Sequence, residues 1–306
     1  MTAAMRQPLI FDIKRYAIND GPGIRLAIYF KGCSLRCAWC HNPESIVPQA
    51  QKLFTPERCI GCGECIKACP QQALEMTDEG IHTDPARCIL CGNCARICPT
   101  RAMEISGEEK SIGELMDMID REQHLFDRSG GGVTVSGGEP LLYPDYLFKL
   151  LDCCAERRIH RAIDTAGHVP ADTLLAAAER TELFLFDLKL IDSERHQRLT
   201  GVDNRLILSN LRALAATGAQ IQIRIPLIKG INASDQDLQA FAATICALPG
   251  EKKTVALLPY HAIAVHKYRK LGADYQVNAL QPPEQDDLDR AIDCFSHYGL
   301  SATIGG

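Results

Sequence analysis

The chain has 306 residues, which is enough for one large domain and a small one. Its 46% hydrophobic and 23% charged residues are ordinary for a soluble globular protein, and its net charge of −5 argues against nucleic acid or an anionic membrane as a partner. No apolar run reaches the length of a membrane span, and residues 1–11 lack the apolar core of a signal peptide, so we expect a cytoplasmic protein, monomeric by default.

Cysteine is strongly over-represented. The chain has 15 cysteines, and eleven of them fall between Cys33 and Cys98. In a reducing compartment such a density is better explained by metal ligands than by disulfides. The other four lie on apolar helical patterns without motif spacing and are expected to be core thiols. They are Cys153, Cys154, Cys246 and Cys294.

The first 30 residues predict an extended segment, a turn and a buried strand. Residues 9–18 alternate in part between apolar and polar side chains, and residues 19–23 contain the turn-forming sequence Asn-Asp-Gly-Pro-Gly. Residues 26–30 form a short apolar run that suits a buried strand. This strand leads directly into a loop that is rich in cysteine.

The loop carries Cys33, Cys37 and Cys40 at the spacing C-x3-C-x2-C. At this spacing one loop can fold three thiolates around a single metal centre, and no fourth cysteine is nearby. Structural zinc and iron–sulfur sites take four protein ligands, so a site with three leaves one position open for a small molecule. The spacing predicts a catalytic metal centre; a zinc loop with a distant fourth ligand is the alternative.

An internal repeat follows. Residues 57–76 return 29 positions later as residues 86–105, and each copy contains C-x2-C-x2-C-x3-C-P. This is the pattern of bacterial two-cluster ferredoxins, in which the fourth cysteine of each run binds the other cluster. It predicts two [4Fe-4S] clusters, with zinc as the alternative, in an inserted α+β ferredoxin-like domain spanning residues 52–107. The expected ligand sets are Cys59, Cys62, Cys65 and Cys98 for one cluster, and Cys88, Cys91, Cys94 and Cys69 for the other.

The rest of the chain alternates between helices and strands. Residues 111–127 predict an amphipathic helix that Ser111 and Glu114 start with a capping box. Further helices are expected at 145–157, 171–179, 205–216, 235–247 and 284–297, and strands at 133–135, 161–164, 183–188, 221–227 and 254–259, with a short extended tail at 301–304. With residues 26–30 these strands number six, which predicts an α/β fold, a partial (β/α)6 TIM-type barrel formed by residues 1–51 and 108–306.

Polar residues follow all six predicted strands. Active sites of parallel barrels lie at the carboxyl ends of the strands, so the set as a whole favours one site at one rim. Any single member alone is better explained as a helix cap or a surface turn. In chain order the residues are the cysteine loop; Gly137, Gly138 and Glu139; Asp164 and Thr165; Asp187, Leu188 and Lys189; Arg224; and His261.

The residues on either side of the cysteine loop form a signature. Gly21-Pro22-Gly23-Ile24-Arg25 precedes Gly32-Cys33, and His41-Asn42-Pro43 follows the last cysteine. With the loop itself, these motifs resemble the glycyl radical enzyme activating enzymes of the radical S-adenosylmethionine (SAM) superfamily, in the subgroup with a ferredoxin-like insertion. Tyr29 stands where that signature usually has phenylalanine, a conservative difference. The resemblance implies a radical SAM partial barrel.

The resemblance also implies how SAM is held. Cys33, Cys37 and Cys40 would bind a third [4Fe-4S] cluster, whose open iron takes SAM. Gly138 and Glu139 match the Gly-Gly-Glu motif of these enzymes, in which the carboxylate would accept a charge-assisted hydrogen bond from the SAM ammonium.

Other residues match family positions around the rest of SAM. Asp164, Thr165 and Asp187 correspond to positions near the SAM carboxylate, with a monovalent cation expected between the acidic side chains. Lys189 and Arg224 are the expected cationic partners of that carboxylate. The remaining expected SAM contacts are Trp39, Cys40 and His41 through their backbone, together with Leu188 and His261.

The implied activity is that of an oxidoreductase. The reduced cluster gives one electron to SAM, methionine leaves, and the 5′-deoxyadenosyl radical removes a hydrogen atom from the Cα of one glycine in a partner glycyl radical enzyme. Reduced flavodoxin or ferredoxin is the expected electron donor. The ferredoxin-like domain is expected to relay the electron or, alternatively, to serve only as a docking module.

Two further function classes are considered. A ferredoxin-type electron carrier would not need Gly137-Gly138-Glu139 or His261, and a radical SAM maturase would not need the flanking signature. The expected partner is an isethionate sulfite-lyase, then a choline trimethylamine-lyase. A diol or glycerol dehydratase, a hydroxyproline dehydratase and an arylacetate decarboxylase are the other candidates, and the sequence does not decide among them.

Overall fold

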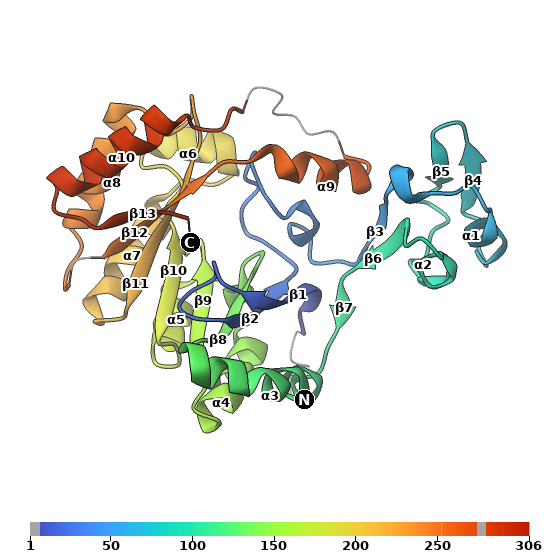
Figure 1. Ribbon diagram of the computed structural model, residues 1–306, viewed down its shortest axis with the longest axis horizontal. Helices are drawn as coiled ribbons and strands as arrows, with labels where there is room; N and C mark the ends of the chain where they lie inside the picture. The colour runs from blue at the N-terminus through green and yellow to red at the C-terminus, as the bar shows by residue number, and fades with distance from the viewer. Residues whose placement is uncertain (1–6, 252, 274–279, 306) are drawn as a thin grey trace.

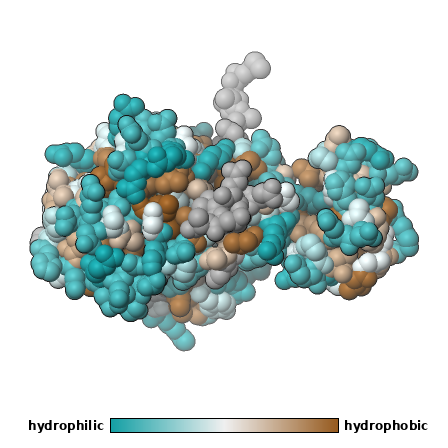
Figure 2. Space-filling model, turned by 90° about the horizontal axis from the view of Figure 1, so that it is seen from above, coloured by the Kyte–Doolittle hydropathy of each residue, from teal (hydrophilic) through white to brown (hydrophobic). Residues whose placement is uncertain are grey.

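The computed structural model describes residues 7–251, 253–273 and 280–305. The outer ends of the predicted barrel domain, residues 1–6 and 306, lie outside the described residues. Figure 1 shows a large body of strands and helices joined to a small lobe, and Figure 2 shows this lobe projecting from one side of the large body.

A nine-stranded sheet forms the centre of the large body. Its order is β13-β12-β11-β10-β9-β8-β2-β1-β7. All neighbours from β2 to β13 are parallel, and β1 and β7 are antiparallel additions at one edge. Within the described chain the sheet stays open between β7 and β13. The strands are β1 (Leu9–Ala17), β2 (Arg25–Phe30), β7 (Glu108–Glu109), β8 (Gly132–Gly137), β9 (His160–Thr165), β10 (Leu183–Asp187), β11 (Ile221–Leu227), β12 (Thr254–Pro259) and β13 (Ala302–Ile304).

Helices connect the strands and cover the outside of the sheet in Figure 1. Their apolar faces and the strands form one continuous core. The helices of this body are α3 (Ile112–Ser129), α4 (Pro144–Glu156), α5 (Ala171–Ala178), α6 (Ser193–Thr200), α7 (Arg205–Ala216), α8 (Asp235–Cys246), α9 (Val265–Lys270) and α10 (Gln285–His297), with short 3-10 turns η1 (Pro43–Ser45), η3 (Pro140–Leu142) and η4 (Ala262–Ala264). None of the helices in the described part of the chain is long and apolar enough to cross a membrane.

The expected order of elements in this body is confirmed. All six predicted strands are present, as are the extended tail, the helix with the Ser111–Glu114 capping box and the five later helices. The sequence analysis missed α6 and α9. Helix α6 reads Ser-Glu-Arg-His-Gln-Arg-Leu-Thr and buries only His196 and Thr200, so it lacks the apolar stripe from which a helix is recognised.

The small lobe contains both copies of the repeat. Strands β3 (Gln51–Phe54) and β6 (Met103–Ser106) pair antiparallel and form its stem. Beyond the stem lie η2 (Pro56–Arg58), α1 (Glu64–Lys67), the hairpin of β4 (Leu74–Thr77) and β5 (Gly80–Thr83), and α2 (Asn93–Ile97). Cys65, Leu74, Ile81 and Met103 make a small core of its own.

Lysines connect the stem to the large body. The buried Lys31 donates through Nζ to the backbone oxygen of Glu44 and, at 3.0 Å, to Gln51 Oε1. On α9, Lys267 Nζ lies 2.7 Å from Asn42 Oδ1 and 3.0 Å from Glu44 Oε1. These contacts tie the segment after the cysteine loop to the start of the lobe.

Candidate active site

The cysteine loop is held from both sides by backbone hydrogen bonds. Gly32 N donates to Ser45 O at 2.7 Å, while Arg36 N and Ala38 N donate to Thr200 O and Leu199 O on α6 at 2.7 and 2.9 Å. Helix α6, which the sequence analysis missed, is therefore part of the scaffold for the predicted metal ligands.

The three cysteines of the loop suit a metal centre. Burial raises the pKa of Cys33 and of Cys40 to about 12, and it also raises that of Cys37. Thiols of this kind stay protonated near neutral pH unless a cation compensates the thiolate, and bound iron supplies that compensation. The residues present therefore fit the iron–sulfur cluster that the spacing predicts.

Glycines bring β8 against the end of β2. A Cβ added at Gly137 would lie 2.3 Å from Phe30 O, and one at Gly138 would lie 2.0 Å from Gly32 O. Gly138 N donates to Phe30 O at 2.8 Å, and Glu139 N donates to Gly32 O at 2.8 Å. Only glycine fits at these two positions, so the turn after β8 lies directly against the start of the cysteine loop.

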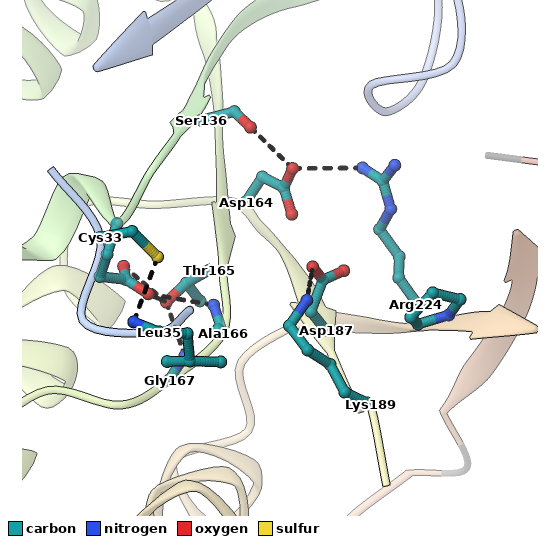
Figure 3. A network of polar contacts seen from close by, with 12 residues as sticks. Cys33, Leu35, Ser136, Asp164, Thr165, Ala166, Gly167, Asp187, Lys189 and Arg224 are labelled. Carbon is teal, nitrogen blue, oxygen red and sulfur yellow. Dashed lines mark hydrogen bonds and ion pairs between the residues drawn. The ribbon is translucent and has the colours of Figure 1, made fainter. Parts of the chain in front are cut away.

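The Glu139 carboxylate is fully buried and engaged within the fold. It accepts hydrogen bonds from Thr165 Oγ1 at 2.8 and 2.9 Å, from Ala166 N at 3.0 Å and from Leu141 N at 3.3 Å. Figure 3 shows two of the donors, Thr165 and Ala166, near Cys33. Burial raises the pKa of Glu139 to about 7, although these hydrogen bonds oppose the shift. The carboxylate thus joins the turn after β8 to the end of β9.

Glu139 makes stability depend on pH. The pKa of about 7 in the folded protein lies above the ordinary value of 4.5. The stabilisation of the folded protein by the protonated Glu139 is therefore fully present below pH 4.5 and is lost as pH rises through 7. Between pH 5 and pH 8 we expect the free energy of unfolding of the cluster-free protein to fall by about 2–3 kcal/mol relative to Glu139→Gln. Urea titrations of both proteins across this range measure the difference, and parallel pH profiles would contradict it.

Carboxylates converge on Arg224. Arg224 Nη1 lies 3.5 Å from Asp164 Oδ2 and 3.9 Å from Asp20 Oδ1, and Ser136 Oγ donates to Asp164 Oδ2 at 2.7 Å. Figure 3 shows Asp164 between Ser136 and Arg224. Burial raises the pKa of Asp164 to about 6; Arg224 opposes this shift, and the Asp187 carboxylate adds to it. This group of side chains therefore contains more carboxylates than cations, because only Arg224 and Lys189 carry positive charge in it.

The sequence analysis missed two residues of this network, Asp20 and Ser136. Asp20 Oδ2 accepts from Tyr29 Oη at 2.9 Å, so the turn before β2 reaches Arg224 on β11. Ser136 was passed over between the strand and the glycines. Asp20 stands directly before Gly21 of the signature, and that position was the available signal for it.

Lys189 lies just after β10 and pairs with the last residue of that strand, Asp187. Its Nζ lies 2.8 Å from Asp187 Oδ2, and the lysine side chain is only 12% exposed. Burial acts to lower the pKa of Lys189, but the Asp187 carboxylate and the Cys37 and Cys33 thiols outweigh it, so the pKa is raised. A protonated ammonium therefore lies beside Asp187, close enough to Cys37 and Cys33 to interact with them electrostatically.

The remaining candidates divide between the core and the rim. Trp39 is buried against Leu190, Ile228 and Tyr260, so its ring belongs to the core and only its backbone is available to a ligand. Leu188 is also buried. His41 and His261 are exposed.

Two cysteine-lined cavities lie in the lobe. One is lined by Cys69, Cys88, Cys91 and Cys94, and the other by Cys59, Cys62, Cys65 and Cys98. In the described residues, no group of three or more His, Cys, Asp or Glu side chains was found that could hold a single metal ion. The cysteines of each cavity come from both copies of the repeat, as a two-cluster ferredoxin requires.

Known proteins match both parts of the chain. A family model described as a 4Fe-4S dicluster domain matches residues 58–113, and one described as a 4Fe-4S single cluster domain matches residues 19–78. The trans-4-hydroxy-L-proline dehydratase activating enzyme of Clostridioides difficile is 41% identical over 98% of this chain and 99% of its own length. The isethionate sulfite-lyase activating enzyme of Desulfovibrio desulfuricans is 39% identical over 88% of each.

A solved structure agrees with these relatives. A domain of the pyruvate-formate lyase-activating enzyme from Bacteroides vulgatus superposes with a TM-score of 0.51 and 38% identity, covering 58% of this chain and 100% of that domain. The open parallel sheet, the three-cysteine loop and the full-length relatives agree with one another. The chain belongs to the glycyl radical enzyme activating enzymes of the radical SAM superfamily.

Proposed function

We propose that this protein activates a partner glycyl radical enzyme by removing a hydrogen atom from the Cα of one glycine. The observation that carries the proposal is the loop of Cys33, Cys37 and Cys40 at the rim of an open parallel sheet, next to the Asp187–Lys189 pair. When bound, a [4Fe-4S] cluster and SAM supply the one-electron radical chemistry. The protein's own groups bind, orient and enclose the reactants.

Different residues around the loop are proposed to bind different parts of SAM. Gly138 allows close approach of the backbone, and Glu139 and Thr165 hold the turn that carries it. Lys189 and Arg224 supply the positive charge that a carboxylate needs. Trp39, Cys40 and His41 contribute through their backbone, and Leu188 and His261 complete the expected contacts.

A monovalent cation near Asp164 and Asp187 is part of the proposal. Asp20, Asp164 and Asp187 all act on the charge of Arg224, so three carboxylates face this arginine and the nearby Lys189. Adding the carboxylate of SAM would increase the negative charge further. A small cation would offset it, as burial of like charges requires.

We also propose three [4Fe-4S] clusters in two domains. Residues 1–51 and 108–306 form the SAM-binding partial barrel, and residues 52–107 form the ferredoxin-like domain. The two lobe cavities support the assignment of the second and third clusters to the two cysteine sets predicted from the repeat. Iron and sulfide analysis after anaerobic reconstitution counts the clusters.

The lobe is proposed to relay electrons from reduced flavodoxin or ferredoxin. If so, Cys62→Ala should lower the rate of SAM cleavage at least tenfold with the protein donor, because one lobe cluster is lost, and much less with dithionite, which can reduce the site cluster directly. Cys62 is exposed and lines one cavity, while the exposed Cys246 lies outside both motifs, so Cys246→Ala is the matched control. Undiminished activity with the protein donor would leave docking as the role of the lobe.

The partner is proposed from the relatives. A trans-4-hydroxy-L-proline dehydratase is the first candidate and an isethionate sulfite-lyase the second, since their activating enzymes share 41% and 39% identity with this chain. The open edge of the sheet would admit the partner's glycine loop, and closure around it would exclude water.

The test of the function is direct. The reconstituted protein is mixed anaerobically with SAM, a reductant and each candidate partner, and electron paramagnetic resonance is recorded. A glycyl radical with one partner supports the proposal; none with any candidate enzyme, despite SAM cleavage, would contradict it. We further propose that the protein is cytoplasmic and monomeric and that it binds neither nucleic acid nor a membrane. Light scattering measures its molar mass and tests whether it is a monomer.

A further inference from the structure

Lys52 on β3 is a half-buried residue whose ammonium is shielded from solvent and has no hydrogen-bond partner among the described residues. Leaving an ammonium desolvated and unpaired costs several kcal/mol, so such a group normally faces negative charge. The surroundings of Lys52 show where this charge would come from.

The side chain lines one of the two cysteine cavities. Lys52 contributes to the cavity of Cys69, Cys88, Cys91 and Cys94, and it does not line the cavity of Cys59, Cys62, Cys65 and Cys98. The second cavity is lined instead by Phe54, two residues further along β3, and by Glu64. One strand thus presents a cation to the first cavity and an aromatic ring to the second, where a carboxylate also lies.

Strand register shows which cavity is nearer the large body. Lys52 pairs with Ile105 and Phe54 pairs with Met103, so the first pair lies closer to the ends of β3 and β6 that connect to the large body. Ile105 lines the Lys52 cavity and Met103 lines the other. Figure 1 shows this stem between the large body and the rest of the lobe. The Lys52 cavity is therefore at the inner end of the lobe.

We propose that Lys52 raises the reduction potential of the cluster held by Cys69, Cys88, Cys91 and Cys94 above that of the other lobe cluster. This inference rests on the proposed pair of lobe clusters. Each cluster gains one electron from the reduced donor protein, and no bond forms or breaks. Positive charge close to a cluster stabilises its more negative, reduced form, and charge is among the factors that set such potentials. Electrons entering the lobe would then collect at its inner end.

Cysteine sulfurs lie close to the Lys52 ammonium. Burial lowers the pKa of this ammonium overall, and the sulfurs of Cys94, Cys88, Cys65 and Cys69 only partly oppose that shift. Three of these four cysteines belong to the inner cavity. The net negative charge of a four-thiolate cluster would therefore help to keep the lysine protonated.

Redox titration of the full chain tests the proposal. In a background of Cys33→Ala, Cys37→Ala and Cys40→Ala, only the lobe clusters titrate, and each is followed by electron paramagnetic resonance. Lys52→Met and Lys52→Gln should lower the ratio of reduced to oxidised inner cluster about tenfold at fixed potential, a shift of about 59 mV for one electron. The variant Cys91→Ser alters the spectroscopic signal of the inner cluster. It therefore shows which redox transition, or wave, in the titration belongs to that cluster.

Two controls separate charge from packing. Lys52→Arg keeps the charge and should keep the potential. Lys67→Met removes a lysine in the same lobe whose side chain is 72% exposed and paired with Glu64 at 2.7 Å, so both waves should stay in place. Unchanged waves in Lys52→Met and Lys52→Gln, with both clusters present, would overturn the role of Lys52 alone. A parent protein without two reducible lobe clusters would overturn the proposed cofactors as well.

Discussion

Replacing Cys37 with alanine is expected to reduce the formation of 5′-deoxyadenosine from SAM to the level of a protein-free control. Cys37 is one of only three cysteines in the loop, and the loop already lacks a fourth thiolate. Losing one of the three would leave a cluster without enough protein ligands to stay bound. Chromatography of anaerobic reaction mixtures with dithionite measures the product.

Two measurements make the Cys37 result specific. Iron analysis should show that Cys37→Ala keeps the lobe iron, because the eight lobe cysteines are unchanged. Cys246→Ala removes an exposed thiol outside every motif and should cleave SAM at the rate of the parent protein. Continued production of 5′-deoxyadenosine by Cys37→Ala would refute the assignment of this loop as the SAM-binding cluster site.

Replacing Lys189 with methionine is expected to lower the rate of SAM cleavage by about 10²–10³-fold, the usual cost of losing one preorganised charged group at an active site. Two effects combine. The ammonium that is proposed to pair with the SAM carboxylate disappears, and the partly buried Asp187 carboxylate loses its partner at 2.8 Å. Because that loss adds repulsion towards an anionic ligand, SAM binding should weaken as well.

Equilibrium binding of SAM and single-turnover cleavage separate the two effects of Lys189→Met. The matched control is Lys229→Met, which breaks the ion pair of this half-buried lysine with the exposed Glu284 and should leave both quantities unchanged. The double variant Asp187→Asn with Lys189→Met removes the unpaired carboxylate and should recover part of the lost affinity. Parent-like binding and cleavage by Lys189→Met would exclude the proposed role of this lysine.

Much of the fold was accessible from the sequence because its signals are local. The spacing of Cys33, Cys37 and Cys40 indicates that a single loop can bind one metal centre. The repeat of residues 57–76 indicates that a small domain can bind two iron–sulfur clusters. Apolar runs such as residues 26–30 correspond to the buried strand β2. The alternation of strands and helices then predicted a parallel sheet.

Contacts across the sheet were not accessible in this way. Arg224 meets Asp164 across 60 positions of sequence because β9, β10 and β11 are in parallel register, and Asp20 joins them through the turn before β2. No local pattern specifies such a meeting. It depends on strand order, register and the direction of each side chain together.

Two further features were decided only by the tertiary structure. The Glu139 carboxylate, predicted to accept a hydrogen bond from the SAM ammonium, also accepts hydrogen bonds from Thr165 and Ala166 at the end of β9. Lys52 reads as an ordinary surface lysine until β3 pairs with β6 and its ammonium faces a cavity lined by four cysteines. The sequence by itself determined which residues are the predicted metal ligands, because that information lies in short spacings. The tertiary structure alone decided which charges surround those ligands, because packing brings distant residues together.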